Sequence, residues 1–389
     1  SVGEAMYRET DLIDVWFDSG AMPYAQVHYP FENKDLIDSK KEFPANFIAE
    51  GVDQTRGWFF TMHAIAGLAF DSVAYKAVIS NGLVLDKNGQ KMSKRLGNAV
   101  DPFKAIDDYG ADALRWYMIT NAQPWDNLKF DFAGVKEIQR KFFGTLHNSY
   151  SFFSLYANVD KFDPLTEAVS YDNLLEIDHW ILSKLNSLIK EVTEKLDDFE
   201  PTKAFRPISD FVQNELSNWY VRLCRRRFWK GQMGQDKLGA YQTLYSCLTT
   251  IAKLIAPVAP FYADQLYQDL TKTSSSVHLS DFPISNELKI SKDLERRMSL
   301  AQLMSSLVLS IRKKEGIRVR QPISRIIIPV FSESQENDIL AIKSLILSEV
   351  NAKEIELIKE DSGVFVKHGK PNFKTLGRKA GKAMNEVAE

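Results

Sequence analysis

A run of ten residues with a glycine near each end carries the strongest chemical signal in the sequence. Gly89 to Asn98 reads GQKMSKRLGN and places the three cations Lys91, Lys94 and Arg95 within five residues. Cationic groups on flexible stems can follow the phosphates of a nucleotide and donate hydrogen bonds where negative charge develops in a transition state. A basic loop of this kind is also often a solvated turn and nothing more. The pattern alone therefore leaves both interpretations open.

Four segments in order resemble one enzyme family. Residues 91–94 (KMSK) resemble the KMSKS signature of class I aminoacyl-tRNA synthetases, and residues 81–82 (NG) precede that loop. Residues 14–20 (DVWFDSG) resemble the segment before the second half of the catalytic domain in the isoleucine, valine and leucine enzymes. Residues 50–59 (EGVDQTRGWF) resemble the isoleucine form of a strand-to-helix motif that is more apolar in the valine enzymes. The sequence is identified as a member of the isoleucyl-tRNA synthetase family over essentially its whole length.

The resemblance implies a role in binding ATP for five residues: Gly82, Lys91, Met92, Ser93 and Lys94. Lys94, the second lysine of the signature, is implied to stabilise the transition state in which the isoleucine carboxylate attacks the α-phosphate, and Lys91 to support it. Mg²⁺ is expected to accompany ATP through the other half of the active site. Arg95 departs from the commonest form of the signature, which has serine at that position.

The resemblance also implies a site for the aminoacyl-adenylate, formed by Glu50, Gly51, Asp53, Gln54, Trp16 and Trp58. Free backbone N–H groups where a parallel strand meets a helix favour acceptors on a ligand, which agrees with this assignment. Asp53 suits ribose hydroxyls, and it could equally cap the helix. By the same resemblance, the two tryptophans wall the isoleucine pocket, although tryptophans in such a motif more often belong to the core.

Two features expected of a complete enzyme of this family are missing from the sequence. No His-x-Gly-His string occurs among the six histidines, and no editing domain precedes the first segment. The chain begins at Ser1 without a methionine, so we expect a fragment that is inactive by itself. Cys224 and Cys247 form no CxxC pair, which argues against zinc and fits a reducing cytoplasm. No apolar run approaches the roughly 18 residues of a membrane span.

The hydrophobic pattern predicts three segments of different class. Residues 1–135 alternate short apolar runs with helical patterns, which predicts α/β structure; the resemblance makes this the second half of a doubly wound, Rossmann-like catalytic domain. Its predicted elements are a buried strand at Phe47–Ala49, a helix at Gln54–Phe70, a strand at Ala77–Ile79 and a helix at Pro102–Ile119.

Residues 136–290 predict only helices, and by resemblance they form the helical-bundle anticodon-binding domain. Residues 291–389 predict a long helix followed by a small α/β C-terminal domain. The expected elements are helices at Ile177–Phe199, Thr202–Trp229, Lys237–Ala256 and Ser291–Lys314, then strands at Ile326–Ile328 and Glu354–Leu357 on either side of a further helix.

The net charge of −2 conceals three cationic clusters beyond the loop. The first interleaves cations with aromatic residues, as unstacked RNA bases and phosphates require, and we expect it to contact tRNA through Arg222, Arg225, Arg226, Arg227 and Trp229. A solvated helix end whose arginines favour the helix dipole is the alternative. The other two clusters, residues 312–325 and 367–382, could lie along the tRNA backbone or be solvated faces.

The sequence therefore predicts part of a cytoplasmic, monomeric enzyme that activates isoleucine with ATP and transfers it to tRNA(Ile). One alternative is a tRNA-binding module without catalytic competence. Another is the valine or leucine member of the same class, which residues 53–58 (DQTRGW) disfavour.

Overall fold

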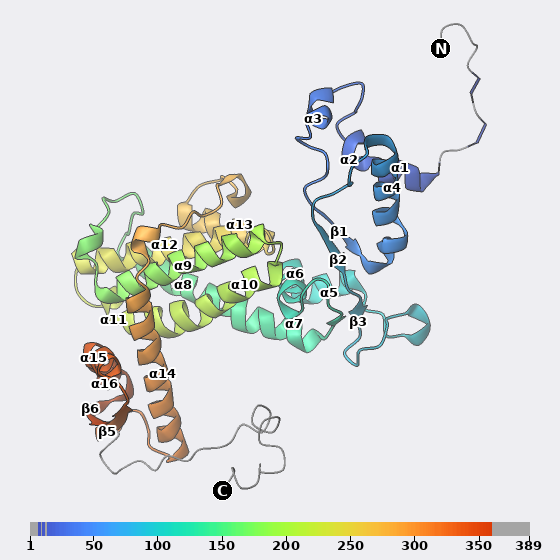
Figure 1. The fold of residues 1–389 in the computed structure, drawn as a ribbon. Helices are drawn as coiled ribbons and strands as arrows, with labels where there is room; N and C mark the ends of the chain where they lie inside the picture. Colours follow the sequence, from blue (N-terminus) through green and yellow to red (C-terminus); the bar gives the residue numbers. More distant parts are fainter. Residues whose placement is uncertain (1–6, 9, 12–13, 360–389) are drawn as a thin grey trace. The chain divides into compact units, whose positions relative to one another are not determined.

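The computed structural model describes residues 7–8, 10–11 and 14–359. The chain divides into two compact units, residues 1–290 and 291–389, and Figure 1 shows the order of their elements. The first unit holds both the predicted α/β segment and the predicted bundle, and the boundary placed at residue 135 stays a prediction. Among the helices of the described residues, none is long and apolar enough to cross a membrane.

A strand-helix-strand unit forms the first part of the chain. Its elements are α1 (Val15–Gly20), α2 (Met22–Ala25), α3 (Lys34–Asp38), β1 (Ile48–Gly51), the 3-10 turn η1 (Val52–Arg56), α4 (Trp58–Phe70) and β2 (Val78–Asn81). β1 and β2 pair in parallel, and α4 connects them. The predicted strand starts one residue later than expected, and Ile48 is its only buried residue. Phe59, Met62 and Ala66 of α4 pack in the core that includes Ile48.

A second parallel strand pair and two helices follow. They are β3 (Val84–Leu85), the 3-10 turn η2 (Lys94–Leu96), α5 (Pro102–Tyr109), α6 (Ala111–Asn121) and β4 (Leu128–Lys129). The helix predicted at Pro102–Ile119 is divided in two at Gly110, whose φ of 82° is incompatible with a continuous helix. Asp101 is the N-cap of α5 as predicted, since its carboxylate accepts from the N–H of Phe103 at 2.9 Å.

A helical bundle completes the first unit. It consists of α7 (Phe132–Ile138), η3 (Gln139–Phe143), α8 (Gly144–Val159), η4 (Tyr171–Asn173), α9 (Glu176–Asp197), α10 (Pro201–Asp210), η5 (Phe211–Val221), α11 (Arg222–Trp229), α12 (Gln235–Ile255), α13 (Pro260–Thr271), η6 (Val277–Leu279) and η7 (Glu287–Lys289). The helix predicted at Thr202–Trp229 contains a π-helical stretch, η5, after Pro207. Proline lacks the N–H that continues an α-helical ladder, and π-helical stretches interrupt such ladders. The apolar stripe of α9 is buried as expected, with Ile181, Leu185 and Val192 nearly inaccessible.

Helix α6 packs directly on this bundle through polar as well as apolar contacts. The indole of Trp116 donates to the Ser209 hydroxyl at 3.1 Å and its ring stacks on Phe142 at 4.3 Å. Arg206 of α10 donates to the Thr120 carbonyl at 2.6 Å, which gives a hydrogen-bond partner to one of the carbonyls left unpaired at the C-terminal end of α6. The α/β segment and the bundle are therefore joined at α6.

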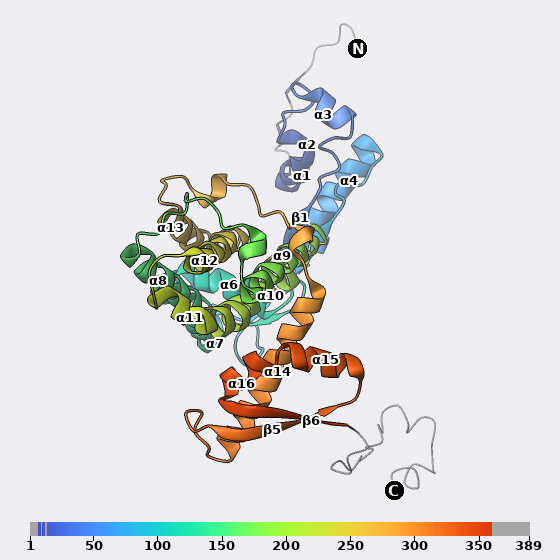
Figure 2. The ribbon, with the colours of Figure 1, turned by 90° about the vertical axis from the view of Figure 1, so that its left-hand side faces the viewer.

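The second unit consists of one long helix and a strand pair with its crossover. Its elements are α14 (Lys292–Lys314), β5 (Ile323–Val330), α15 (Glu333–Ala341), α16 (Lys343–Val350) and β6 (Ala352–Lys359). β5 and β6 are parallel, and α15 and α16 connect them while packing against α14 (Figure 2). The single helix expected between the strands is two helices, divided at Ile342.

Candidate functional site

The carboxyl ends of β1 and β2 lie side by side and carry most of the predicted adenylate residues. The register pairs Glu50 with Ser80 and Gly51 with Asn81, so residues that follow the two strands share one edge. Ligands of open α/β sheets bind beyond this edge. Glu50 is exposed at the end of β1, and Gly82 follows the end of β2. The parallel pairing therefore brings together two motifs that are about thirty residues apart in sequence.

The 3-10 turn η1 arranges the polar groups at this edge. The Gln54 side-chain carbonyl accepts from the N–H of Trp58 at 2.9 Å, which fixes the start of α4. The Gln54 amide donates to the exposed carboxylate of Asp53 at 3.3 Å. Asp53 is not the cap of a helix: Gly51 precedes η1 and Gly57 precedes α4, and neither cap uses a side chain. The alternative of a capping role for Asp53 is therefore wrong.

Trp16 and Trp58 each contact a neighbouring element near this turn. The Trp58 indole donates to the carbonyl of Ser19 at 2.9 Å, which ties α4 to α1. The Trp16 ring lies against Gly57, where an added Cβ would stand 3.4 Å from the ring. Trp16 is 45 % exposed and is therefore not a core residue, while Trp58 is half-buried. The structure thus anchors the Trp58 indole on α1 and leaves the Trp16 ring largely accessible, and their role as a pocket wall stays a prediction.

Gly82 allows a close approach of the backbone that no other residue permits. Its N–H donates to the carbonyl of Pro124 at 2.8 Å, and an added Cβ would lie 2.4 Å from the carbonyl oxygen of Asp126. The backbone nitrogen of Asn127 would lie 3.0 Å from the same Cβ, and the Asn127 side-chain oxygen accepts from the N–H of Leu83 at 2.8 Å. Residues 124–127 therefore hold the segment that leads from β2 into the basic loop.

The basic loop is organised by two residues that sequence reasoning did not select, Asp86 and Asn98. The Asp86 carboxylate accepts from the N–H groups of Asn88 and Gln90 at 2.9 and 2.8 Å, and the Asn98 amide donates to it at 3.0 Å. The Asn98 side-chain oxygen in turn accepts from the N–H of Ser93 at 2.9 Å. The hydrogen bond from Asn98, followed by that from the Gln90 N–H, holds the pKa of Asp86 below its ordinary value.

The predicted catalytic lysines lie in the chain between Asp86 and Asn98. Lys91 is exposed, and its backbone forms an antiparallel bridge with Leu85 that closes the loop. Met92 and Ser93 are half-buried, and the Ser93 hydroxyl accepts from the N–H of Leu96 at 3.2 Å. The backbone of Lys94 starts η2, whereas its side chain lies outside the described residues. Two sequence features could have revealed that Asp86 and Asn98 hold the loop. Aspartate at the first position of a turn accepts from backbone N–H groups, and an asparagine follows Gly97 at the other end of the loop.

The aromatic and basic cluster on α11 is only partly a surface. Arg225, Arg226 and Trp229 are exposed, and the guanidinium of Arg222 lies 5.5 Å from the centre of the Trp219 ring. These side chains present both positive charge and a flat ring, the two features with which proteins bind the phosphates and bases of single-stranded RNA. The predicted cluster of residues 367–382 lies outside the described residues.

Arg227 differs from the other predicted residues of this cluster, because its side chain is largely buried. Its side chain is 12 % exposed and makes a bidentate ion pair with the fully buried carboxylate of Asp178, at 2.7 and 2.8 Å. It also contacts Asp236 at 2.8 Å, while the Tyr220 hydroxyl donates to Asp178 at 2.6 Å. An ionised carboxylate inside a bundle requires such partners. Arg227 therefore has a structural role in the bundle, and its predicted contact with tRNA stays a prediction.

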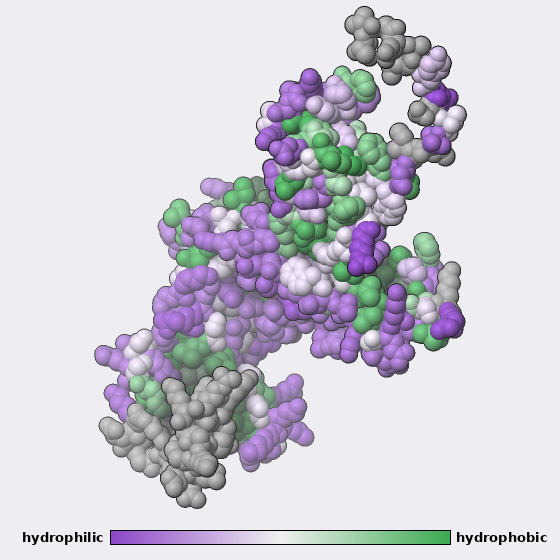
Figure 3. Space-filling model, turned by 45° about the vertical axis from the view of Figure 1, so that its right-hand side comes forward, coloured by the Kyte–Doolittle hydropathy of each residue, from purple (hydrophilic) through white to green (hydrophobic). Residues whose placement is uncertain are grey.

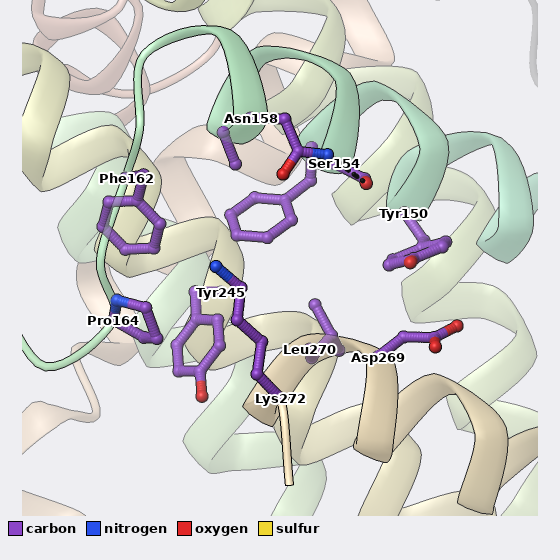
Figure 4. Close-up of a pocket in the computed structure, with 11 residues that line it drawn as sticks. Tyr150, Ser154, Asn158, Phe162, Pro164, Tyr245, Asp269, Leu270 and Lys272 are labelled. Carbon is purple, nitrogen blue, oxygen red and sulfur yellow. Dashed lines mark hydrogen bonds between the residues drawn. The ribbon is translucent and has the colours of Figure 1, made fainter.

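A small pocket lies between α8, α12 and α13 of the bundle, as Figure 4 shows. Aromatic rings of Tyr150, Phe153, Phe162 and Tyr245 line it together with Lys272 and Asp269. Its volume of about 40 Å³ has room for roughly three water molecules and none for a nucleobase. Burial raises the pKa of the Cys224 thiol in the same bundle to about 12, so the thiol stays protonated at neutral pH.

Comparison with known proteins agrees with this geometry. Residues 2–131 match the family model of class I tRNA synthetases for isoleucine, leucine, methionine and valine, and residues 178–328 match the anticodon-binding domain of tRNA ligases. A LeuRS-tRNA-LeuAMS ternary complex of Agrobacterium radiobacter K84 shares the fold over 90% of this chain and 42% of its own, with a TM-score of 0.57 at 17% identity. Methionyl-tRNA synthetase of Mycobacterium tuberculosis, in complex with methionyl-adenylate, covers 64% of this chain and 48% of its own, with a TM-score of 0.51 at 23% identity.

The chain belongs to the class I aminoacyl-tRNA synthetases. Within that class its curated relatives are isoleucine–tRNA ligases: that of Bacteroides fragilis is 63% identical over 99% of the chain, and that of Porphyromonas gingivalis is 58% identical over all of it. The isoleucine–tRNA ligase 2 of Bacillus cereus is 44% identical over 99%. The chain spans about a third of the length of these relatives, 34% to 36%.

Replacement of Arg227 by methionine should lower the free energy of unfolding by about 3 kcal/mol, because it leaves the Asp178 carboxylate buried with one partner fewer. Arg225→Met, on the same helix and exposed, is the matched control and should change stability by no more than about 0.5 kcal/mol. Urea denaturation followed by circular dichroism measures both. Equal stability of the two variants would contradict the structural role of Arg227.

Replacement of Asn98 by alanine should free the basic loop without unfolding the unit, because it removes the hydrogen bonds to Asp86 and Ser93. Trypsin should then cleave after Lys91 about tenfold faster, the factor that corresponds to about 1.4 kcal/mol. Asn88→Ala is the control, since Asn88 contacts Asp86 through its backbone. Equal cleavage rates for both variants would show that Asn98 does not hold the loop.

Proposed function

We propose that the chain forms part of an isoleucine–tRNA ligase, which activates isoleucine with ATP to an enzyme-bound adenylate and transfers it to tRNA(Ile). The observation that carries the proposal is the basic loop Gly89–Asn98, fixed by Asp86 and Asn98 directly after the strand-end site of β1 and β2. Relatives that are isoleucine enzymes over the full length of the chain favour isoleucine over valine or leucine.

In this proposal the protein supplies position and charge and no general base. Lys91 and Lys94 donate to phosphate oxygens as negative charge grows during attack of the isoleucine carboxylate on the α-phosphate, which releases pyrophosphate. The exposed carboxylate of Asp53 accepts from ribose hydroxyls. Trp16 and Trp58 form the apolar wall against the isoleucine side chain, a kind of contact that discriminates by only about 1 to 3 kcal/mol per methylene.

The described residues hold no cluster of three or more His, Cys, Asp or Glu side chains that could bind a metal ion. Mg²⁺ is proposed to accompany ATP through the other half of the active site, and no step in this proposal depends on it. In the helical bundle, Arg222, Arg225, Arg226 and Trp229 are proposed to bind the anticodon region of tRNA(Ile). The monomeric state and the cytoplasmic location stay predictions from the sequence.

Exposed apolar side chains on the N-terminal part support the proposal that the chain is part of a longer protein. Figure 3 shows hydrophobic surface gathered on this part of the chain. Among its side chains, Phe17 is 48 % exposed, Phe60 63 % and Leu68 91 %. Contiguous exposed apolar surface of this kind normally marks an interface. We infer that these side chains pack against the remaining part of the catalytic domain, which the relatives' length would supply.

The purified chain should therefore show no isoleucine-dependent exchange between ATP and pyrophosphate, because half of the nucleotide site is contributed by other residues. The longer protein that carries this segment is the positive control. Robust exchange by the chain alone would overturn the claim that it is an incomplete active site.

In the longer protein, Lys94→Ala should lower the rate of adenylate formation about 100- to 1,000-fold, the usual effect of removing one donor that acts in the transition state. Its affinity for tRNA(Ile) should change little. Lys87→Ala, an exposed lysine in the preceding turn, is the matched control. Pre-steady-state adenylate formation and filter binding measure the two quantities, and parallel losses of both would refute the assignment.

A further inference from the structure

Arg312, near the end of α14, is a buried cation without an acidic partner. The side chain is only 2 % exposed, although a guanidinium stays protonated in proteins. Its Nη2 donates to the backbone carbonyls of Arg318 at 2.5 Å and Val319 at 3.2 Å, and also to that of Gln321. Within residues 14–359, no carboxylate pairs with Arg312, and its Nε and Nη1 have no hydrogen-bond partner.

These contacts fix the loop that follows the helix. Gly316, with a φ of 68°, allows the chain to reverse, and the N–H of Ile317 donates to the Arg312 carbonyl at 2.8 Å. The Asn351 amide donates to the Val319 carbonyl at 2.9 Å from the other side. The loop of residues 315–321 is thus held both by α14 and by the turn before β6, so its side chains project from a fixed backbone.

Four exposed cations project from this helix end and loop: Lys313, Lys314, Arg318 and Arg320. None of them makes an ion pair with a described residue, and Glu315 is the single acid among them. Arg325 behaves differently, because it pairs with Glu356 at 2.7 Å across the two strands. The sequence grouped residues 312–325 as one cationic cluster, but its members differ. Arg312 is buried, Arg325 pairs with Glu356, and the other four cations are exposed without an ion pair among the described residues.

Positive charge is concentrated at the end of α14 and in the loop that follows, where Glu315 is the single acid among the cations. A buried guanidinium lies beneath four exposed cations, and like charges in a partly low-dielectric surrounding repel. An external polyanion relieves this repulsion, and a row of phosphates suits several cations on one rigid segment. The partner is taken to be RNA because residues 178–328, which include this loop, match the anticodon-binding domain of tRNA ligases.

We propose that Lys313, Lys314, Arg318 and Arg320 form a phosphate-binding surface for the tRNA backbone, and that Arg312 is the positioning residue that holds it in place. The proposal rests on the proposed function, since that function supplies the RNA. It assigns no base contact, so the surface contributes affinity that depends on salt and not on nucleotide sequence.

Filter binding of a tRNA(Ile) transcript to the full 389-residue chain, at a series of salt concentrations, tests the surface. The double variant Arg318→Gln/Arg320→Gln should reduce the slope of log K against log salt by about 2, or about 1 for each cation removed. Arg325→Gln is the matched control and should leave the slope unchanged. A wild-type slope in the double variant would overturn the proposed surface.

Arg312→Met tests the positioning role, because it leaves all four exposed cations in place. The expected result is a reduced salt slope in a chain whose circular dichroism remains helical, with partial recovery in Arg312→Lys. A purely structural role would lower the melting temperature and leave the slope at its wild-type value, and that result would overturn the assignment of Arg312. Should Arg312→Met fail to fold, the comparison of Arg312→Lys with wild type decides in the same way.

The outcome also separates this inference from the function on which it rests. If the wild-type chain binds the transcript with a steep salt slope and the loop variants match it, the tRNA-binding function stands and the loop surface is wrong. If the wild-type chain shows no salt-dependent binding of tRNA, the proposed function of this segment fails and the loop surface fails with it.

Discussion

The parallel pairing of β1 with β2 is the constraint on which the candidate site depends. Because the strands run in the same direction, the segment after Gly51 and the segment after Asn81 leave the sheet at one edge. An antiparallel pairing would send them to opposite ends, and the adenylate residues and the basic loop would then be separated by the length of the strands. Helix α4 makes this direction possible, since a parallel connection needs a crossover element. Its first turn is also the place where Gln54 and the two tryptophans meet.

Arginine serves two different purposes in this chain, and the difference lies in burial. Arg227 and Arg312 are both largely buried. Arg227 pairs with the buried carboxylate of Asp178, whereas Arg312 donates hydrogen bonds to backbone carbonyls. Both neighbour exposed cations in the sequence, so charge clustering alone marks all of them equally. In each case the covered arginine fixes the backbone that carries the exposed ones. A fork of five donors makes the guanidinium suited to this role in a way that lysine is not.

Much of the fold followed from the sequence, as did the position of Glu50 and Gly51 at the end of a parallel strand, and the failures have physical causes. The stripe of α9 and the cap at Asp101 are local signals, and both were predicted correctly. The break at Gly110 was missed because glycine is tolerated inside helical patterns, and only its positive φ reveals the turn. The π-helical stretch η5 has no periodic signature that distinguishes it from an α-helix.

Residues that act through distant partners were the least predictable. Asp178 lies 49 residues from Arg227 in the sequence, so nothing local indicated their ion pair. Asp86 and Asn98 were overlooked because the lysines between them carry the recognisable chemistry. Gly82 was selected from a motif, but its close approach to the carbonyl of Asp126 depends on residues 44 positions later.

The attachment of α6 to the bundle has a consequence for how the two halves of the first unit communicate. Arg206 and Ser209 of α10 hold one end of α6, and the chain that enters α5 and α6 comes directly from Asn98. Direct contacts therefore join α10 to α6, and the backbone joins α6 through α5 to the end of the basic loop. By thermodynamic reciprocity, if occupancy of the bundle changes the affinity of the loop for its ligand, that ligand changes the affinity of the bundle by the same factor.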